Sequence, residues 1–158
     1  MQFLNEGQYQ SLGIIIMANR YFKGRPPVSL AVQQGSLKKK YDNIEACSIE
    51  KDRLVCIMNI TPSNESWTYR VQICYKLHKR PEAFLLSPQL QEYDGNSPPH
   101  LYSDSSKNPS LCVYYPKYNE WESTMLLSDT FIPWISTWLH TYEYWLITGK
   151  WHYPDIPH

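Results

Sequence analysis

The sequence predicts an α+β fold in which an antiparallel sheet comes first and helices follow it. Between residues 44 and 86, apolar and polar residues alternate with a period of two, which is typical of half-buried strands. Between residues 131 and 145, large apolar residues recur at spacings of three and four, which is typical of an amphipathic helix. The length of 158 residues fits one domain, residues 1–158.

The N-terminal part of the chain gives weaker signals. Residues 12–22 fit a helical face, but the β-branched run Ile14–Ile16 fits a strand equally well. Pro26 and Pro27 end this element, because proline disfavours helix at the preceding residue. Residues 28–32 then predict a short strand, and the lysines at positions 38–40 predict a solvated basic turn.

The middle of the chain predicts consecutive antiparallel strands. Residues 53–61 place four apolar side chains on one side, namely Leu54, Cys56, Met58 and Ile60. Residues 67–75 do the same with Trp67, Tyr69, Val71, Ile73 and Tyr75, and the polar turn between the two runs predicts a hairpin. Residues 83–86, bounded by prolines, predict a last strand at the sheet edge. We therefore expect a meander of about four strands.

A long loop and a helical region complete the predicted fold. Residues 87–111 are rich in Pro, Ser, Asn and Asp, and a loop of that length in a compact domain usually has a function. The helix that follows has one aromatic face, made of Phe131, Trp134, Ile135, Trp138, Leu139, Tyr142 and Trp145. Ser128 or Asp129 is its expected N-cap, and Gly149 its end. C-terminal helices are thus expected to cover one face of the sheet.

Composition narrows the class of protein. Fifteen basic and fifteen acidic residues balance, which predicts no general attraction to nucleic acid or to an anionic membrane. The chain has neither a bilayer-spanning apolar run nor a signal-peptide pattern at its N-terminus, so we expect a cytoplasmic protein without membrane contact.

The four cysteines fit neither a CxxC pair nor a zinc-ligand pattern, and we expect no metal or cofactor. Cys56 and Cys74 fall inside predicted strands and are expected in the core, whereas Cys47 lies nearer a turn. Cys112 is different, because it stands between a polar loop and an aromatic run, where the predicted strands give way to helix. This position makes Cys112 the candidate reactive residue.

Several motifs around Cys112 resemble those of the ubiquitin-conjugating enzymes. The stretch RPEAFLLSP (80–88) is similar to the family's proline-flanked fourth strand, and PPHLY (98–102) followed by LCVYYP (111–116) is similar to its His-Pro-Asn loop and Cys-Leu. Trp121 stands where the family keeps a tryptophan after its cysteine. The tail FIPWISTWLHTYEYWLITGKWHYP (131–154) resembles the bacterial members encoded in cyclic-oligonucleotide antiphage (CBASS) operons, in their stand-alone form.

This resemblance implies a ubiquitin-conjugating-enzyme-like fold and an acyl-transfer activity. Cys112 would take an acyl group as a thioester and release it to an amine of a protein substrate or to water. By the same resemblance, the partner would be the operon's cGAS/DncV-like nucleotidyltransferase, whose C-terminus takes the place of ubiquitin's.

The family's oxyanion donor, the asparagine of His-Pro-Asn, is absent here, because His100 is followed by Leu101 and Tyr102. We expect Tyr102, Asn108 or backbone amides of the loop to replace it. His100 itself would order the loop or act as an acid or base, and Trp121 would be a packing anchor.

Two other functions are compatible with the sequence. The same fold could serve as a non-catalytic binding module, which the missing asparagine favours. A cysteine hydrolase using Cys112 and His100 is the other, although the sequence offers no glycine-rich nucleophile motif and no clear orienting carboxylate.

Overall fold

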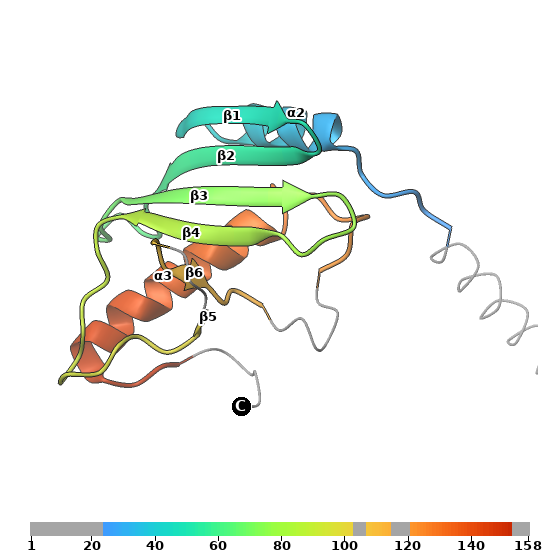
Figure 1. Cartoon of the computed structure of the whole chain (residues 1–158). Coiled ribbons are helices and arrows are strands. Elements are labelled where there is room, and N and C mark those ends of the chain that lie inside the picture. The colour runs from blue at the N-terminus through green and yellow to red at the C-terminus, as the bar shows by residue number, and fades with distance from the viewer. Residues whose placement is uncertain (1–23, 103–106, 115–120, 153–158) are drawn as a thin grey trace, which may run out of the picture.

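A computed structural model describes residues 24–102, 107–114 and 121–152, which form an α+β fold as predicted. The segment 12–22, for which helix and strand were both open, lies outside the described residues. The elements follow one another as α2 (Leu30–Lys40), β1 (Ile44–Glu50), β2 (Arg53–Ile60), β3 (Tyr69–Lys76), β4 (Glu82–Ser87), β5 (Leu101–Tyr102), β6 (Ser110–Leu111) and α3 (Phe131–Thr148). Figure 1 shows α3 lying across the sheet and α2 beside β1.

The sheet has six antiparallel strands in the order β1-β2-β3-β4-β6-β5, so the expected number of about four was too low. The expected edge position of residues 83–86 was also wrong, because Phe84 of β4 pairs with Ser110 of β6. Both added strands are only two residues long and lie within the predicted loop. A segment that short shows no period in the sequence, which is why the pattern missed them.

The predicted hairpin of β2 and β3 is confirmed, with Leu54 opposite Tyr75 and Ile60 opposite Tyr69. The alternating apolar side chains of both strands are buried on one face, which we call the inner face. Trp67, expected on this face, instead precedes β3 and is 50% exposed.

Cys56 and Cys74 are buried as predicted. Cys47 lies in the middle of β1 rather than near a turn.

The strand predicted at residues 28–32 was wrong, because these residues lead into helix α2. Ser29 is the N-cap, and its hydroxyl accepts a hydrogen bond from the backbone N–H of Val32. The lysines predicted to form a turn are the last turn of the same helix, where positive charge is favourable at the helix C-terminus. Only Gln33 and Leu37 of α2 are buried. The helix therefore has no apolar stripe that the sequence could show.

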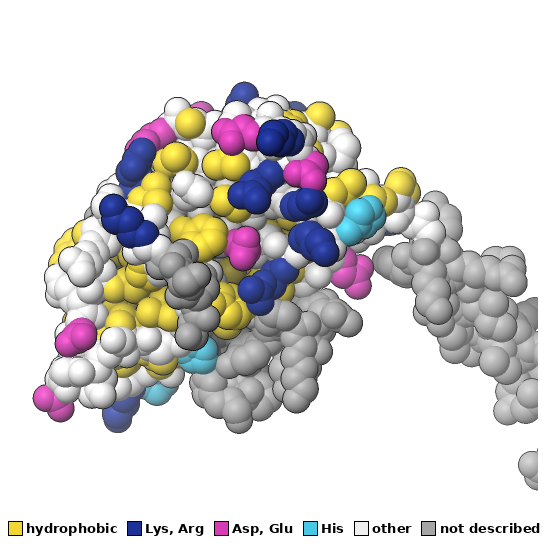
Figure 2. Space-filling view, in the orientation of Figure 1, with side chains coloured by type: hydrophobic (Ala, Val, Ile, Leu, Met, Phe, Trp, Pro, Cys, Tyr) yellow, Lys and Arg dark blue, Asp and Glu magenta, His cyan; other side chains and the backbone are white. Residues whose placement is uncertain are grey.

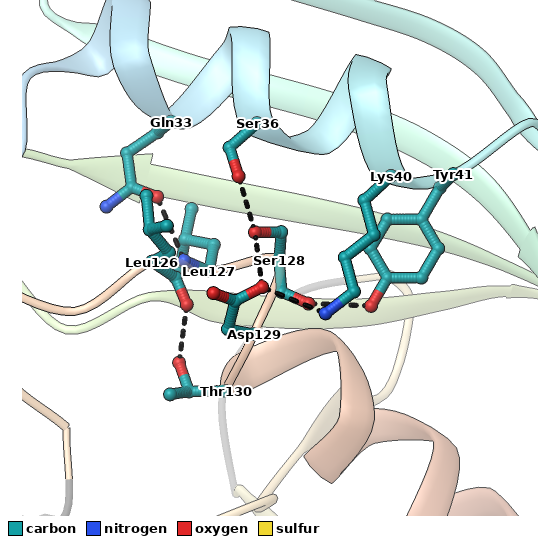
Figure 3. A network of polar contacts seen from close by, with 9 residues as sticks. All are labelled: Gln33, Ser36, Lys40, Tyr41, Leu126, Leu127, Ser128, Asp129 and Thr130. Carbon is teal, nitrogen blue, oxygen red and sulfur yellow. Dashed lines mark hydrogen bonds and ion pairs between the residues drawn. The ribbon is translucent and has the colours of Figure 1, made fainter.

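Helix α2 is joined to the segment 125–130, which leads into α3, by a network of polar contacts (Figure 3). The buried Gln33 side chain donates to the Met125 carbonyl at 2.8 Å and accepts from the Leu127 N–H at 2.9 Å. Around it, the hydroxyls of Ser36 and Ser128 lie 2.6 Å apart, and the Lys40 ammonium pairs with Asp129 at 2.8 Å. These contacts fix the point where α3 begins.

Helix α3 covers the inner face with the predicted aromatic side chains. Most of them are buried, and Trp138 and Tyr142 are almost completely so. The helix begins after Thr130 rather than at Ser128 or Asp129, because Ser128 and Asp129 are engaged with α2. Gly149 ends the helix, as predicted, and its backbone has a left-handed conformation. In the described part of the chain after Cys112, α3 is the single helix, where several were expected.

None of the helices in the described residues is both long enough and apolar enough to cross a membrane.

The Gln33 contacts generate a first prediction. Gln33→Ala should lower the free energy of unfolding by about 2 kcal/mol, because it leaves the buried Leu127 N–H and the partly buried Met125 carbonyl without the Gln33 side chain as a partner. Urea denaturation of the full chain measures this loss. Lys39→Ala, an exposed change on the same helix, should stay within about 0.5 kcal/mol of the parent. Equal losses in the two variants would show that the Gln33 contacts do not stabilise the fold.

Candidate functional site

One carbonyl group, that of His100, contacts both the cysteine segment and helix α3. Cys112 follows β6, and its backbone N–H donates to the carbonyl oxygen of His100 at 2.9 Å. The same oxygen accepts from the indole Nε1 of Trp138 in α3, at 3.1 Å. His100 has a positive φ of 58°, a conformation uncommon outside glycine, at the start of the β5 segment. This carbonyl thus joins the candidate nucleophile to the helix that fills the core.

The imidazole of His100 packs against Trp151, with ring centroids 5.2 Å apart. Trp151 in turn lies 5.2 Å from Trp138, so the ring and the carbonyl of His100 both connect to the aromatic cluster on α3. These contacts suit the loop-ordering role expected of His100. An acid or base role of His100 stays a hypothesis.

The Cys112 side chain is half-buried and shares one acceptor with a tyrosine. Its Sγ donates to the Tyr114 carbonyl at 3.5 Å, and the Tyr102 hydroxyl donates to the same oxygen at 3.4 Å. The thiol and the Tyr102 hydroxyl therefore meet at one oxygen atom. Burial raises the pKa of Tyr102 and the hydrogen bond to Cys112 raises it further, so this hydroxyl keeps its proton at neutral pH and remains a donor.

Arg80 belongs to the candidate site but was not predicted from the sequence. Its guanidinium carbon lies 4.2 Å from the centroid of the Tyr102 ring, within the range of a cation–π interaction. Arg80 belongs to the turn between β3 and β4, and Figure 2 shows lysine and arginine side chains gathered near this end of the sheet. The sequence shows a basic run, residues 76–80, before Pro81. No pattern in the sequence indicates that Arg80 contacts Tyr102.

Asn108 and Trp121 are the other two residues that the sequence indicated. Asn108 stands two residues before β6, on the same segment as Cys112. Trp121 is buried as expected of a packing anchor. It meets Tyr75 edge to face, with ring centroids 5.0 Å apart, and its Nε1 donates to the Thr130 hydroxyl at 3.2 Å. Of the predicted residues, therefore, Tyr102 reaches Cys112 through its side chain and His100 reaches it through its backbone.

This arrangement suits nucleophilic chemistry at sulfur. A half-buried thiol lies beside a protonated hydroxyl, and a cation sits on the ring that carries this hydroxyl. The hydroxyl can donate to a thiolate before reaction or to a carbonyl oxygen that gathers negative charge. Within the described residues, no three His, Cys, Asp or Glu side chains come together as a metal site.

The chain matches a known protein family. A family model described as Type II CBASS E2 protein matches residues 33–158, a range that contains every residue of the site. No curated protein matches the chain at a significant level.

The contact between Tyr102 and Cys112 generates a second prediction. Tyr102→Phe should slow the alkylation of Cys112 by iodoacetamide at neutral pH by about threefold to tenfold, because the reacting sulfur loses a nearby hydrogen-bond donor. Mass spectrometry of the tryptic peptide 108–117 follows this reaction separately from the other cysteines.

Arg80 provides a matched test of the same contact. Arg80→Gln should also slow the alkylation, and the effect should be smaller in a Tyr102→Phe background, since part of it acts through the hydroxyl. Arg80→Lys keeps the charge and should retain most of the reactivity. Unchanged alkylation in both Tyr102→Phe and Arg80→Gln would mean that neither residue controls the thiol.

Proposed function

We propose that this chain, which belongs to the type II CBASS E2 proteins, is an acyl carrier that takes the C-terminus of a cGAS/DncV-like nucleotidyltransferase as a thioester on Cys112. The carrier would regulate the nucleotidyltransferase in antiphage defence by conjugating it. The family membership supplies the biological setting, and the surroundings of Cys112 supply the chemistry.

The observation that carries the proposal is the Tyr114 carbonyl, which accepts hydrogen bonds from both the Cys112 thiol and the Tyr102 hydroxyl and so brings these two side chains to one point after β6. In the proposed step, the Cys112 thiolate attacks the carbonyl carbon of the partner's terminal residue. The partner's C-terminus must reach Cys112 in an activated form, as an acyl-adenylate or a thioester. A sulfur–carbon bond then forms, the bond from that carbon to AMP or to the other sulfur breaks, and AMP or a thiolate leaves, while the carbonyl oxygen carries negative charge in between. A donor must already stand beside the sulfur for this charge to be stabilised.

Tyr102 is the proposed donor, in place of the asparagine that the chain lacks. At rest its hydroxyl points to the Tyr114 carbonyl at 3.4 Å, a long and therefore weak hydrogen bond. Turning the hydroxyl to an oxyanion next to Sγ costs little and gains a charge-assisted hydrogen bond. The Arg80 cation on the ring makes the hydroxyl a better donor, since it favours negative charge on the phenol oxygen. Asn108 is the second candidate, by its place on the same segment.

The proposed fold is that of the ubiquitin-conjugating enzymes. Three features support it: the antiparallel order of β1 to β4, the proline that precedes β4, and the cysteine between β6 and the long helix α3. Strands β5 and β6 extend the sheet toward the cysteine.

A non-catalytic binding module is the second candidate function. It is favoured by the contact of Sγ with the Tyr114 carbonyl, because this contact already engages the thiol within the chain. In this case the chain would bind the same nucleotidyltransferase without forming a covalent bond.

A third prediction separates these two functions. When the chain is expressed together with the nucleotidyltransferase of its operon, intact-mass analysis should find a covalent adduct of the two proteins that dithiothreitol removes. Cys112→Ala should abolish the adduct. Cys112→Ser should give an ester that dithiothreitol does not cleave, because an oxygen ester resists thiol exchange.

Cys47→Ser is the matched control, since Cys47 is also a half-buried cysteine but lies on β1. It should leave the adduct intact. If no loading condition yields an adduct, and Cys112→Ala protects cells from phage as well as the parent does, the acyl-carrier proposal fails. A stable noncovalent complex in that case would support the binding module.

A further inference from the structure

We propose that Cys47 and Cys56 form a redox-active dithiol, which hydroperoxides oxidise to a disulfide that joins β1 to β2. The two residues are direct partners in the register of these strands. The dithiol plays no part in the acyl-carrier chemistry proposed for Cys112, so the two proposals stand or fall separately.

The strand geometry places the two cysteines where a disulfide can form. Direct partners in an antiparallel pair lie on the same face, here the inner face that contains Cys56. The Cys47 carbonyl accepts from Gln34 Nε2 of α2 at 2.8 Å, so it points away from β2 and the pair is a non-hydrogen-bonded one. Cα atoms in such pairs are about 4.5 Å apart, within the range that disulfides span.

The two thiols interact and differ in burial. A hydrogen bond from the Cys56 thiol lowers the pKa of Cys47 to about 7, and the charge of Lys38 acts in the same direction. That hydrogen bond and burial raise the pKa of Cys56. Cys47 is half-buried and Cys56 is fully buried. Cys47 is therefore the thiol that ionises first and meets the oxidant, and Cys56 is the thiol that resolves the product.

Neither Cys74 nor Cys112 lies where it could form a disulfide with Cys47 in the same molecule. Cys74 is opposite Val55, on the outer face of the sheet, and its sulfur accepts from Gln72 Nε2 at 3.3 Å. Cys112 follows β6, which is separated from β1 by three strands. Since neighbouring strands are about 4.8 Å apart, Cys112 is too far from Cys47 for a bond within one molecule.

The proposed oxidation proceeds in two steps. The Cys47 thiolate attacks one oxygen of hydrogen peroxide, forming a sulfenic acid and releasing hydroxide, which takes up a proton to become water. Cys56 sulfur then attacks the Cys47 sulfur, the S–S bond forms, and the sulfenic hydroxyl leaves with the Cys56 proton as a second water. Two thiols are oxidised and one peroxide is reduced. The new bond ties the edge strand to its neighbour where α2 meets β1.

Peptide mapping tests this proposal on the full chain. Trypsin cleavage leaves each cysteine on its own peptide: 41–51 for Cys47, 54–70 for Cys56, 71–76 for Cys74 and 108–117 for Cys112. The chain is treated with hydrogen peroxide, alkylated under denaturing conditions without reductant and digested. The expected product is peptide 41–51 linked to peptide 54–70, with Cys74 alkylated. Dithiothreitol should separate the linked pair.

Two variants serve as controls for the peptide mapping. In Cys47→Ser, Cys56 should stay alkylatable after peroxide, while in Cys74→Ala the linked pair should form as in the parent. If Cys47 links instead to Cys112 or to a second molecule, or is oxidised to sulfinic acid while Cys56 stays free, the proposed dithiol is wrong. Because the parent chain gives the decisive result, a variant that fails to fold does not weaken the test.

Discussion

Burial of the aromatic face of α3 against the inner face of the sheet is the constraint on which the rest of the structure depends. Within the described residues, α3 supplies eight of the buried side chains, while α2 adds two, of which one is polar. Each large side chain removed from water contributes about 2 kcal/mol, so this one helix accounts for much of the stability of the core. The Gln33 contacts matter because they fix where that helix starts.

The same helix also positions the cysteine. Trp138, which is fully buried, uses its indole N–H to hold the His100 carbonyl, and that carbonyl holds the backbone of Cys112. A tryptophan in the core normally needs a partner for its N–H, and here the partner is the backbone of the loop that precedes the candidate nucleophile. Core packing and site geometry are therefore coupled through this oxygen atom, and also through the Tyr114 ring, which packs against Phe131 and Trp134 of α3.

The sequence predicted those parts of the fold that repeat a pattern over many residues. The hairpin of β2 and β3, the aromatic face of α3 and the end of that helix at Gly149 were predicted because each has a period or a terminal signal. Helix α2 was missed because its buried face consists of Gln33 and Leu37, and β5 and β6 because two residues show no period. At the site, Cys112, His100 and Tyr102 came from local motifs. Arg80 could not, since only folding brings the turn between β3 and β4 onto the Tyr102 ring.

Under the proposed function, the acceptor shared by Cys112 and Tyr102 would distinguish the free thiol from the acylated one. In the free thiol, both residues donate to the Tyr114 carbonyl. A sulfur that carries an acyl group has no proton to donate, and its contact with that carbonyl is lost. The acyl oxygen then offers the Tyr102 hydroxyl a new acceptor close by. Loading would thus exchange one hydrogen-bond arrangement for another, and Arg80 would favour the loaded one by strengthening the hydroxyl as a donor.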